Sequence, residues 1–166
     1  MRYGRLTSAL ALGVSLWLAS MAHGQDLAAL QASQDLAGLQ QGFTADINAL
    51  NSRNLTAAVA SVDDRLVLFG IFSPFPIEGK EQFRHAIQEY FENYEHAVMT
   101  PIDPQYQAMG ATGVAWGNFR LATRRKGGVQ EYADGRYMLT YTRANGTWHA
   151  ISMHYSLLEP LVKQRP

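Results

Sequence analysis

The stretch ADGRYMLTYTRANGTWHAISMHYSLLEP, residues 133–160, decides the fold. It consists of two runs of alternating apolar and polar residues on either side of Asn145-Gly146. Asn-Gly favours a two-residue type I′ turn, because both central residues of that turn take a positive φ. We therefore predict a β-hairpin whose register is set by this turn.

The turn fixes which residues lie opposite each other. If Asn145 and Gly146 form the loop, the predicted pairs include Arg136 with Tyr155. Successive strand residues alternate between the two faces of a sheet, so one face carries Thr142, Thr140, Met138, Arg136, His149, Ile151, Met153 and Tyr155. The other carries Tyr137, Leu139, Tyr141, Arg143, Trp148, Ala150, Ser152 and His154. Neither face is plainly polar, so we expect helices on one and another layer, such as a second subunit, on the other.

The N-terminus has the three parts of a secretory signal peptide. Arg2 and Arg5 precede an apolar run from Leu6 to Leu18, and small residues flank His23 before Gln25. We expect residues 1–24 to be a cleaved leader and the protein to be exported, either to a periplasm or into the medium. The apolar run is shorter than the roughly 20 residues that span a bilayer, so no stable membrane anchor is expected. Residues 25–34 are predicted to be a tether, residues 35–160 the domain and residues 161–166 a tail.

Composition excludes several classes of function. Without the two leader arginines, 12 basic residues face 14 acidic ones, a formal charge of −2, which argues against a nucleic-acid partner. The one basic cluster, Arg124 to Lys126, stands beside Gly127-Gly128, where we expect a solvated turn. The absence of cysteine excludes disulfides and thiolate chemistry. The histidines have no metal-ligand spacing, no glycine-rich phosphate loop follows a strand and no serine has a nucleophile-elbow context, so we expect neither metal nor cofactor.

The rest of the chain alternates helical and extended patterns. From Asp35 an apolar stripe of Leu36, Leu39, Phe43, Ile47 and Leu50 predicts a helix ending near Asn51, with Gln40, Gln41, Asp46 and Asn48 largely off the stripe. Asn54 is expected to cap a short helix, residues 65–70 to form a strand and the proline-containing residues 73–76 a loop. A third helix with an aromatic stripe follows, from about residue 79 to Tyr94, and then strands over 105–109 and 115–124. This order predicts an α+β domain with helices gathered on one face of a curved antiparallel sheet.

The candidate site lies on the face that Arg136 shares with Met138, Met153 and Tyr155. If the turn at Lys126-Gly127-Gly128 has three residues, Arg120 falls on that same face; a two-residue turn would separate them. Buried arginines need acidic partners or an anionic ligand. Two kinds of partner are open for these arginines. One is a carboxylate of the protein itself, such as Asp103 or Glu131, and the other is a bound anionic ligand. An acid–base role for Tyr155, Asp103 or a histidine in the same cavity is a third alternative.

Several segments together resemble a known family. They are Glu78-Gly79-Lys80 before an amphipathic helix, PIDPQYQAMG at 101–110, the strand 116–121, and Gly146-Thr147-Trp148-His149 through His154-Tyr155-Ser156. They look like the association (hub) domain of calcium/calmodulin-dependent protein kinase II. More broadly they resemble the nuclear transport factor 2-like superfamily, with its SnoaL-like polyketide cyclases and ketosteroid isomerases. The resemblance covers roughly residues 35–160.

This resemblance implies a cone, in which a strongly bent antiparallel sheet wraps around about three helices and encloses a cavity. It also implies self-association, as a dimer or larger, through the outer surface of the sheet. The pocket arginines of hub domains match Arg120 and Arg136, whereas their third position is Tyr155 here. No kinase domain precedes the module, and the catalytic Asp/Tyr set of ketosteroid isomerase has no clear match. We therefore expect a binding or assembly domain whose ligand is a small organic molecule, with anionic molecules among the candidates, contacted by Arg120, Arg136, Tyr155 and Met153. The alternative is a cofactor-independent isomerase, lyase or cyclase that acts by general acid–base catalysis.

Overall fold

The computed structural model describes residues 8–158 and 162–163. The basic start of the predicted leader and most of the predicted tail lie outside the described residues. The elements, in chain order, are α1 (Ser8–Asn51), α2 (Leu55–Ala60), β1 (Val62–Phe69), β2 (Ile77–Glu78), α3 (Gly79–Asn93), β3 (Tyr94–Met109), β4 (Thr112–Arg125), β5 (Gln130–Ala144), β6 (Thr147–Leu157) and β7 (Val162–Lys163).

The chain divides into two compact units, Met1–Gln34 and Asp35–Pro166. All the strands belong to the second unit, together with the C-terminal part of α1. No helix of the described residues is both long enough and apolar enough to cross a membrane. Whether residues 1–24 are a cleaved leader stays a prediction.

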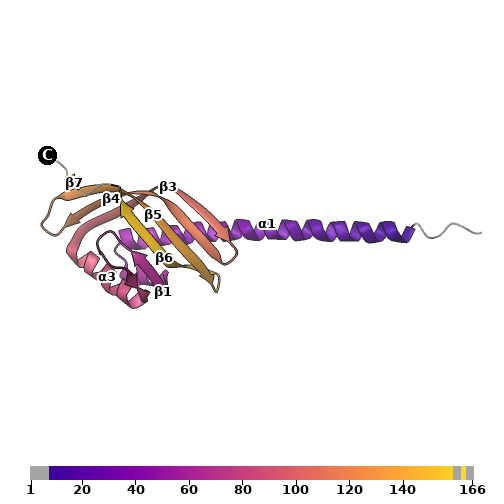
Figure 1. Ribbon diagram of the computed structural model, residues 1–166, viewed down its shortest axis with the longest axis horizontal. Coiled ribbons are helices and arrows are strands. Elements are labelled where there is room, and N and C mark those ends of the chain that lie inside the picture. The colour runs from indigo at the N-terminus through magenta and orange to yellow at the C-terminus, as the bar shows by residue number, and fades with distance from the viewer. Residues whose placement is uncertain (1–7, 159–161, 164–166) are drawn as a thin grey trace, which may run out of the picture. The chain divides into compact units, whose positions relative to one another are not determined.

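The sheet of the second unit is mixed and strongly curved. Its strands lie in the order β2-β1-β6-β5-β4-β3, with β7 paired to β5 (Figure 1). All neighbours are antiparallel except β1 and β6, which are parallel. The α+β cone is confirmed. The expected curved antiparallel sheet is present, with β1 and β6 as its one parallel pair among the described strands.

Local sequence signals explain where the short elements begin and end. The Asn54 side chain accepts a hydrogen bond from the Ala57 N–H at 3.0 Å, the cap expected for α2. Residues 73–76 form the predicted loop, in which Pro74 and Pro76 supply no N–H to a ladder. Asn145 and Gly146 have φ of 52° and 80°, as a type I′ turn requires. The predicted hairpin is therefore present.

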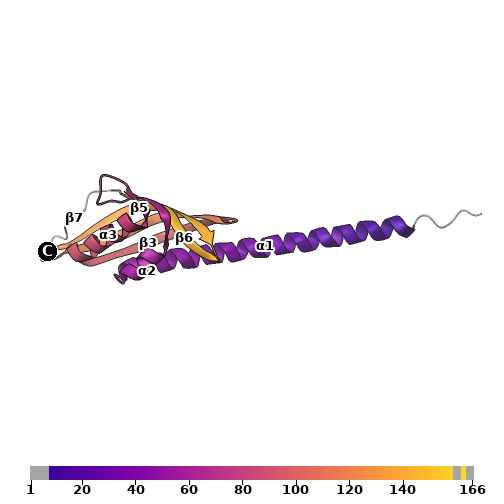
Figure 2. The ribbon, with the colours of Figure 1, turned by 90° about the horizontal axis from the view of Figure 1, so that it is seen from below.

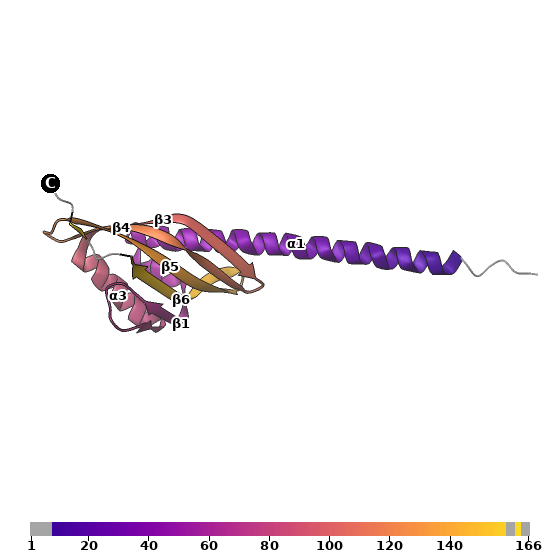
Figure 3. The same ribbon diagram turned by 45° about the horizontal axis from the view of Figure 1, so that its top comes forward.

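The core lies between the helices and the inner face of the sheet. Leu39, Phe43 and Ile47 of the α1 stripe are buried against odd-numbered residues of β4 and β5, such as Phe119 and Leu139. Figures 2 and 3 show that α3 also lies along the sheet formed by these strands. The even-numbered residues of β4 and β5 therefore form the outer face.

A β-bulge in β6 changes the predicted register. Thr142 pairs with His149 as expected, but the register shifts between Thr140 and Tyr141, so that Thr140 pairs with Ser152. Ile151 is the extra residue that this shift leaves without a partner. The predicted pairing of Arg136 with Tyr155 is therefore wrong: Arg136 pairs with Ser156, and Tyr155 pairs with Tyr137.

Candidate functional site

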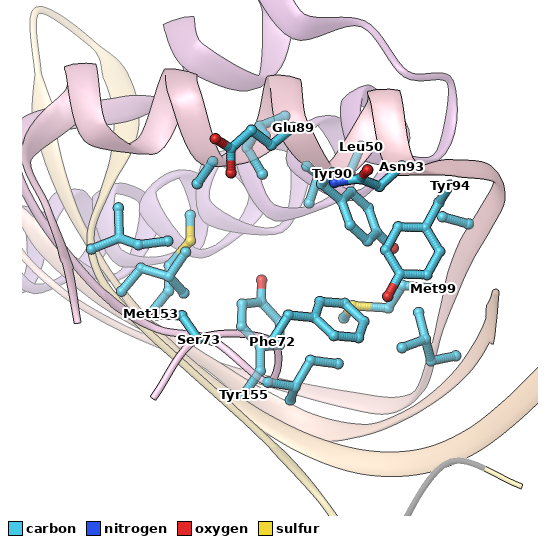
Figure 4. A pocket seen from close by; sticks show the side chains of 18 of the residues that line it. Leu50, Phe72, Ser73, Glu89, Tyr90, Asn93, Tyr94, Met99, Met153 and Tyr155 are labelled. Carbon is cyan, nitrogen blue, oxygen red and sulfur yellow. The ribbon is translucent and has the colours of Figure 1, made fainter. Parts of the chain in front are cut away.

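A pocket of about 360 Å³ lies between α3 and the inner face of the sheet (Figure 4). Its walls are mostly apolar and come from α1, β1, the β1–β2 loop, β2, α3, β3, β4 and β6. The lining residues are Leu50, Asn51, Leu68, Gly70, Ile71, Phe72, Ser73, Ile77, Phe83, Ala86, Ile87, Glu89, Tyr90, Asn93, Tyr94, Ala97, Met99, Phe119, Leu121, Arg125, Met153 and Tyr155.

The bulge at Ile151 brings Met153 and Tyr155 into this pocket. Trp148 and Ala150 are buried on the inner face, and regular alternation would carry the odd-numbered residues after them to the outer face. The extra residue reverses that alternation, so Met153 is 3% exposed and both Met153 and Tyr155 line the pocket. Sequence reasoning placed these two residues in the cavity, but on a register that the structure does not have.

The arginines predicted to line the cavity lie on the opposite face. Arg120 pairs with Asp134 and Asn118 with Arg136, which is the register of the three-residue turn. The two arginines therefore do share a face, but it is the outer one, where both are exposed. Arg120 donates two hydrogen bonds to Asp134, at 2.8 and 3.0 Å, and not to Asp103 or Glu131. The structure thus contradicts the predicted placement of Arg120 and Arg136 in the pocket.

Several of the polar groups that face the pocket come from β6 and α3. The Tyr155 hydroxyl points into the space from the sheet side, and the side chains of Glu89, Tyr90 and Asn93 project from α3 opposite it (Figure 4). Burial raises the pKa of Tyr155, and the nearby Asp46 carboxyl adds to this effect. Tyr155 is therefore a neutral hydroxyl that can donate a hydrogen bond throughout the physiological pH range.

An aromatic cluster forms one side of the pocket. The Phe72 ring lies 5.6 Å from that of Tyr90 and 5.4 Å from that of Tyr94. The Arg125 guanidinium lies 5.0 Å from the centre of the Tyr94 ring, on its face. Sequence reasoning treated Arg125 as part of a solvated turn and missed its place at the pocket.

A buried carboxyl lies in the core near Tyr155. Asp46 is 5% exposed, and the Tyr141 hydroxyl donates to its Oδ2 at 2.9 Å. Burial raises the pKa of Asp46 to about 7, against the lowering effect of the Tyr141 hydrogen bond. The expectation that Asp46 lies off the apolar stripe of α1 is wrong. Its spacing of seven from Leu39 and three from Phe43 was the available signal.

The described residues contain no group of three or more histidines, aspartates or glutamates that could hold a metal ion. What the pocket offers is a hydroxyl donor, a carboxylate, an amide and a guanidinium around an apolar space. Such a site can bind an organic molecule through its apolar surface and orient one or two polar atoms.

Comparison with known proteins agrees with this geometry. The family model of the SnoaL-like domain matches residues 39–160. No curated protein sequence matches this chain. Many solved structures share the fold, including proteins named as nuclear transport factor 2-like, so the resemblance inferred from the sequence is confirmed.

Three of these structures illustrate how much the named activities of proteins with this fold differ. A protein from Novosphingobium aromaticivorans named as an aromatic ring hydroxylase has a TM-score of 0.70 at 19% identity, covering 78% of this chain and 93% of its own. A Xanthomonas campestris protein named as a calcium/calmodulin-dependent protein kinase II association domain has a TM-score of 0.64 at 18% identity. The match covers 71% of this chain and 84% of that protein. A hexachlorocyclohexane dehydrochlorinase has a TM-score of 0.68 at 11% identity, and the match covers 78% of this chain and 88% of that protein. At these identities the likeness extends to the fold alone.

Proposed function

The chain belongs to the SnoaL-like domain family, and we propose that its domain binds a small organic molecule in the pocket between α3 and the sheet. The observation that carries the proposal is the pocket itself. It has about 360 Å³ of space, mostly apolar walls and the Tyr155 hydroxyl pointing into it (Figure 4). Ligand sites typically combine apolar walls with a few convergent polar groups.

The lining favours a ligand with a flat apolar body and one hydroxyl or carbonyl group. Met153 and Phe119 provide apolar contact, and Tyr155 provides a hydrogen bond. Arg120 and Arg136 give no support to an anionic ligand here, since both lie on the outer face. An anionic group on the ligand would instead be accommodated beside Arg125.

Replacing Tyr155 by phenylalanine tests this assignment. 2-Naphthol, a fluorescent molecule with two fused rings and one hydroxyl, serves as the probe, together with a panel of phenols and aromatic ketones. We expect Tyr155→Phe to weaken binding roughly three- to tenfold, the contribution of one neutral hydrogen bond. Tyr132→Phe is the matched control, because Tyr132 is 37% exposed on the outer face and should change nothing. Equal binding by both variants, or no binding by any member of the panel, would contradict the proposal.

A second candidate is catalysis by an isomerase or lyase mechanism. It is favoured by the presence of a carboxylate, Glu89, and a neutral hydroxyl donor, Tyr155, on opposite sides of one pocket. In such a reaction the carboxylate takes a proton from the carbon next to a carbonyl group, and the hydroxyl stabilises the enolate oxygen. A hexachlorocyclohexane dehydrochlorinase is one of the proteins that share this fold.

This candidate predicts exchange of carbon-bound protons. Cyclic ketones incubated with the protein in deuterium oxide should incorporate deuterium next to the carbonyl group, as followed by proton NMR. Glu89→Gln should abolish the exchange, and Glu92→Gln, on the same helix but outside the pocket lining, should leave it intact. Exchange no faster than in buffer would remove the catalytic candidate and leave the binding proposal standing.

We further propose that the protein is exported, to a periplasm or into the medium. The support is the basic, apolar and small-residue pattern of residues 1–24. N-terminal sequencing of the protein recovered from an exporting bacterial host should find a chain that starts near Gln25. Recovery of the chain only from the cytoplasm with its first 24 residues intact would contradict export.

A further inference from the structure

The connection between β1 and β2 is an uncharged aromatic loop at the edge of the sheet. No charged residue occurs from Leu66 to Ile77. Three phenylalanines of this stretch have large solvent-exposed fractions, which are 50% for Phe69, 46% for Phe72 and 75% for Phe75. Phe69 ends β1 on the outer face of the sheet, 6.2 Å from the His154 ring, whereas Phe72 and Phe75 lie in the loop that follows. Exposed apolar side chains of this kind mark contact sites for proteins or membranes.

The tip of this loop is a formed structure. The Ser73 hydroxyl donates to the Phe75 carbonyl at 2.8 Å, and the Phe75 N–H donates to the Ser73 Oγ at 3.2 Å. Pro74 and Pro76 fix their own φ and have no N–H. The loop therefore presents phenyl rings, and it lacks the run of backbone donors that an added β-strand from a partner would need.

The loop also forms part of the pocket wall. Gly70, Ile71, Phe72 and Ser73 line the pocket, together with Arg125 at the end of β4. Phe72 and Arg125 contact the same ring, that of Tyr94. The aromatic loop and the end of β4 thus meet at one side of the pocket.

This side of the pocket carries positive charge. Arg125 and Lys126 are exposed, and among the described residues neither has a carboxylate within ion-pairing distance. The neighbouring Arg124 is neutralised by Glu95 at 2.5 Å. The acidic group that faces the pocket itself is Glu89, on α3.

We propose that this end of the domain, the loop Phe69–Ile77 together with Arg125 and Lys126, docks on an anionic lipid surface. The rings of Phe72 and Phe75 enter the boundary between headgroups and acyl chains, and the two cations remain at the level of the phosphates. Docking in this way would turn the adjoining wall of the pocket toward the bilayer, from which an amphiphilic ligand could enter. The surface shares Phe72 and Arg125 with the pocket wall but does not include the Tyr155 hydroxyl, so Tyr155→Phe should leave docking unchanged while it weakens ligand binding.

A label at one position can test the proposal, because the chain has no cysteine. In the variant Phe75→Cys, an environment-sensitive fluorophore is attached to the loop. In Met109→Cys it is attached at the end of the β3–β4 ladder that lies away from Arg125. Phe75 and Met109 are 75% and 57% exposed, so neither substitution disturbs the core. The full chain is mixed with vesicles of phosphatidylcholine alone or with an equal part of phosphatidylglycerol.

We expect a blue shift and an intensity rise from position 75 and none from position 109, with the larger response on the anionic vesicles. The apolar segment near the N-terminus could hold the whole chain on a vesicle, but it would not bury position 75 selectively. Lys126→Ala, read out by the same label at position 75, should weaken binding to the anionic vesicles about fivefold, the effect of one basic residue near a charged surface.

Three outcomes would overturn the proposal. The label at position 75 could stay in water while the protein sediments with vesicles. The labels at positions 75 and 109 could respond equally. The label at position 75 could also respond to rising protein concentration without any lipid, which would assign the loop to a contact with a second copy of the chain.

Discussion

Asp46 is a carboxyl group held in the apolar core, with Tyr141 as its hydrogen-bond donor. Burial raises its pKa from 3.8 to about 7. In the unfolded chain the group loses its proton near the ordinary value. Between about pH 4 and pH 7 the folded state therefore binds more protons than the unfolded state, so the free energy of unfolding falls as the pH rises through this window.

Asp46→Asn removes this pH dependence. An asparagine can still accept the Tyr141 hydrogen bond, and it carries no charge at any pH. We expect the variant to unfold with nearly wild-type free energy at pH 4 and to be more stable than wild type at pH 8, by up to about 4 kcal/mol. Urea unfolding at four pH values between 4 and 8 measures the difference.

Asp134→Asn is the control for that experiment. Asp134 is exposed, and the hydrogen bond from Arg120 lowers the pKa of its carboxyl, so its contribution is lost only as the pH falls through its lowered pKa. The slope between pH 5 and pH 7 should therefore stay as in wild type. An unchanged slope in Asp46→Asn would show that the Asp46 carboxyl is already ionised in the folded state at pH 5.

Single residues were the least predictable level of this molecule. Arg120 and Arg136 could be placed on one face from the turn length, but nothing in their own sequence context says which face is the inner one. That choice depends on how the odd-numbered residues of β4 and β5 pack against α1, which is a long-range property. Asp46 was misplaced for the opposite reason, since its polarity was weighed above its helical spacing.

At the level of elements, local signals were sufficient wherever the chemistry is local. The Asn54 cap, the proline loop and the Asn145-Gly146 turn each depend on a few neighbouring residues, and each is present. The bulge at Ile151 has no such signal, because an extra residue in one strand is defined only by its partner strand. One unpaired residue was enough to move Arg136 and Tyr155 to opposite faces of the sheet.

Gly135 in β5 is required by the packing of a neighbouring strand. A Cβ at this position would lie 2.3 Å from Phe119 Cζ and 2.6 Å from the Ser156 carbonyl oxygen, and the backbone oxygen cannot move aside easily. We expect Gly135→Ala to lower the free energy of unfolding by about 3 kcal/mol through overpacking, as measured by urea denaturation.

Gly70→Ala is the matched control, because the nearest atom to its added Cβ, Leu68 Cγ, is 4.0 Å away. It should change the free energy of unfolding by less than about 1 kcal/mol. Equal effects of the two substitutions would mean that the cost comes from the glycine backbone and not from the contact with Phe119.

For the molecule as a whole, we propose that self-association, which the family resemblance implies, uses the outer face of the sheet. Met138 is 55% exposed there, and its cross-strand neighbours are Trp116 on β4 and His154 on β6. An exposed methionine beside a tryptophan in the middle of a sheet is the kind of centre that contacts between subunits use. The proposed lipid-docking loop begins at Phe69, whose ring lies 6.2 Å from that of His154, so the two surfaces adjoin each other.

Met138→Glu should convert the protein from a dimer or larger assembly to a monomer. A carboxylate at the centre of the contact must give up hydration when the subunits associate, which should raise the dissociation constant about tenfold or more, even with Arg136 two residues away on the same face. Light scattering coupled to size-exclusion chromatography measures the mass, and Met109→Glu, at 57% exposure on the β3–β4 hairpin, is the control that should leave it unchanged. A monomeric wild-type chain at high micromolar concentration would contradict self-association. A dimer that survives Met138→Glu but not Met109→Glu would place the interface at the hairpin end of the sheet instead.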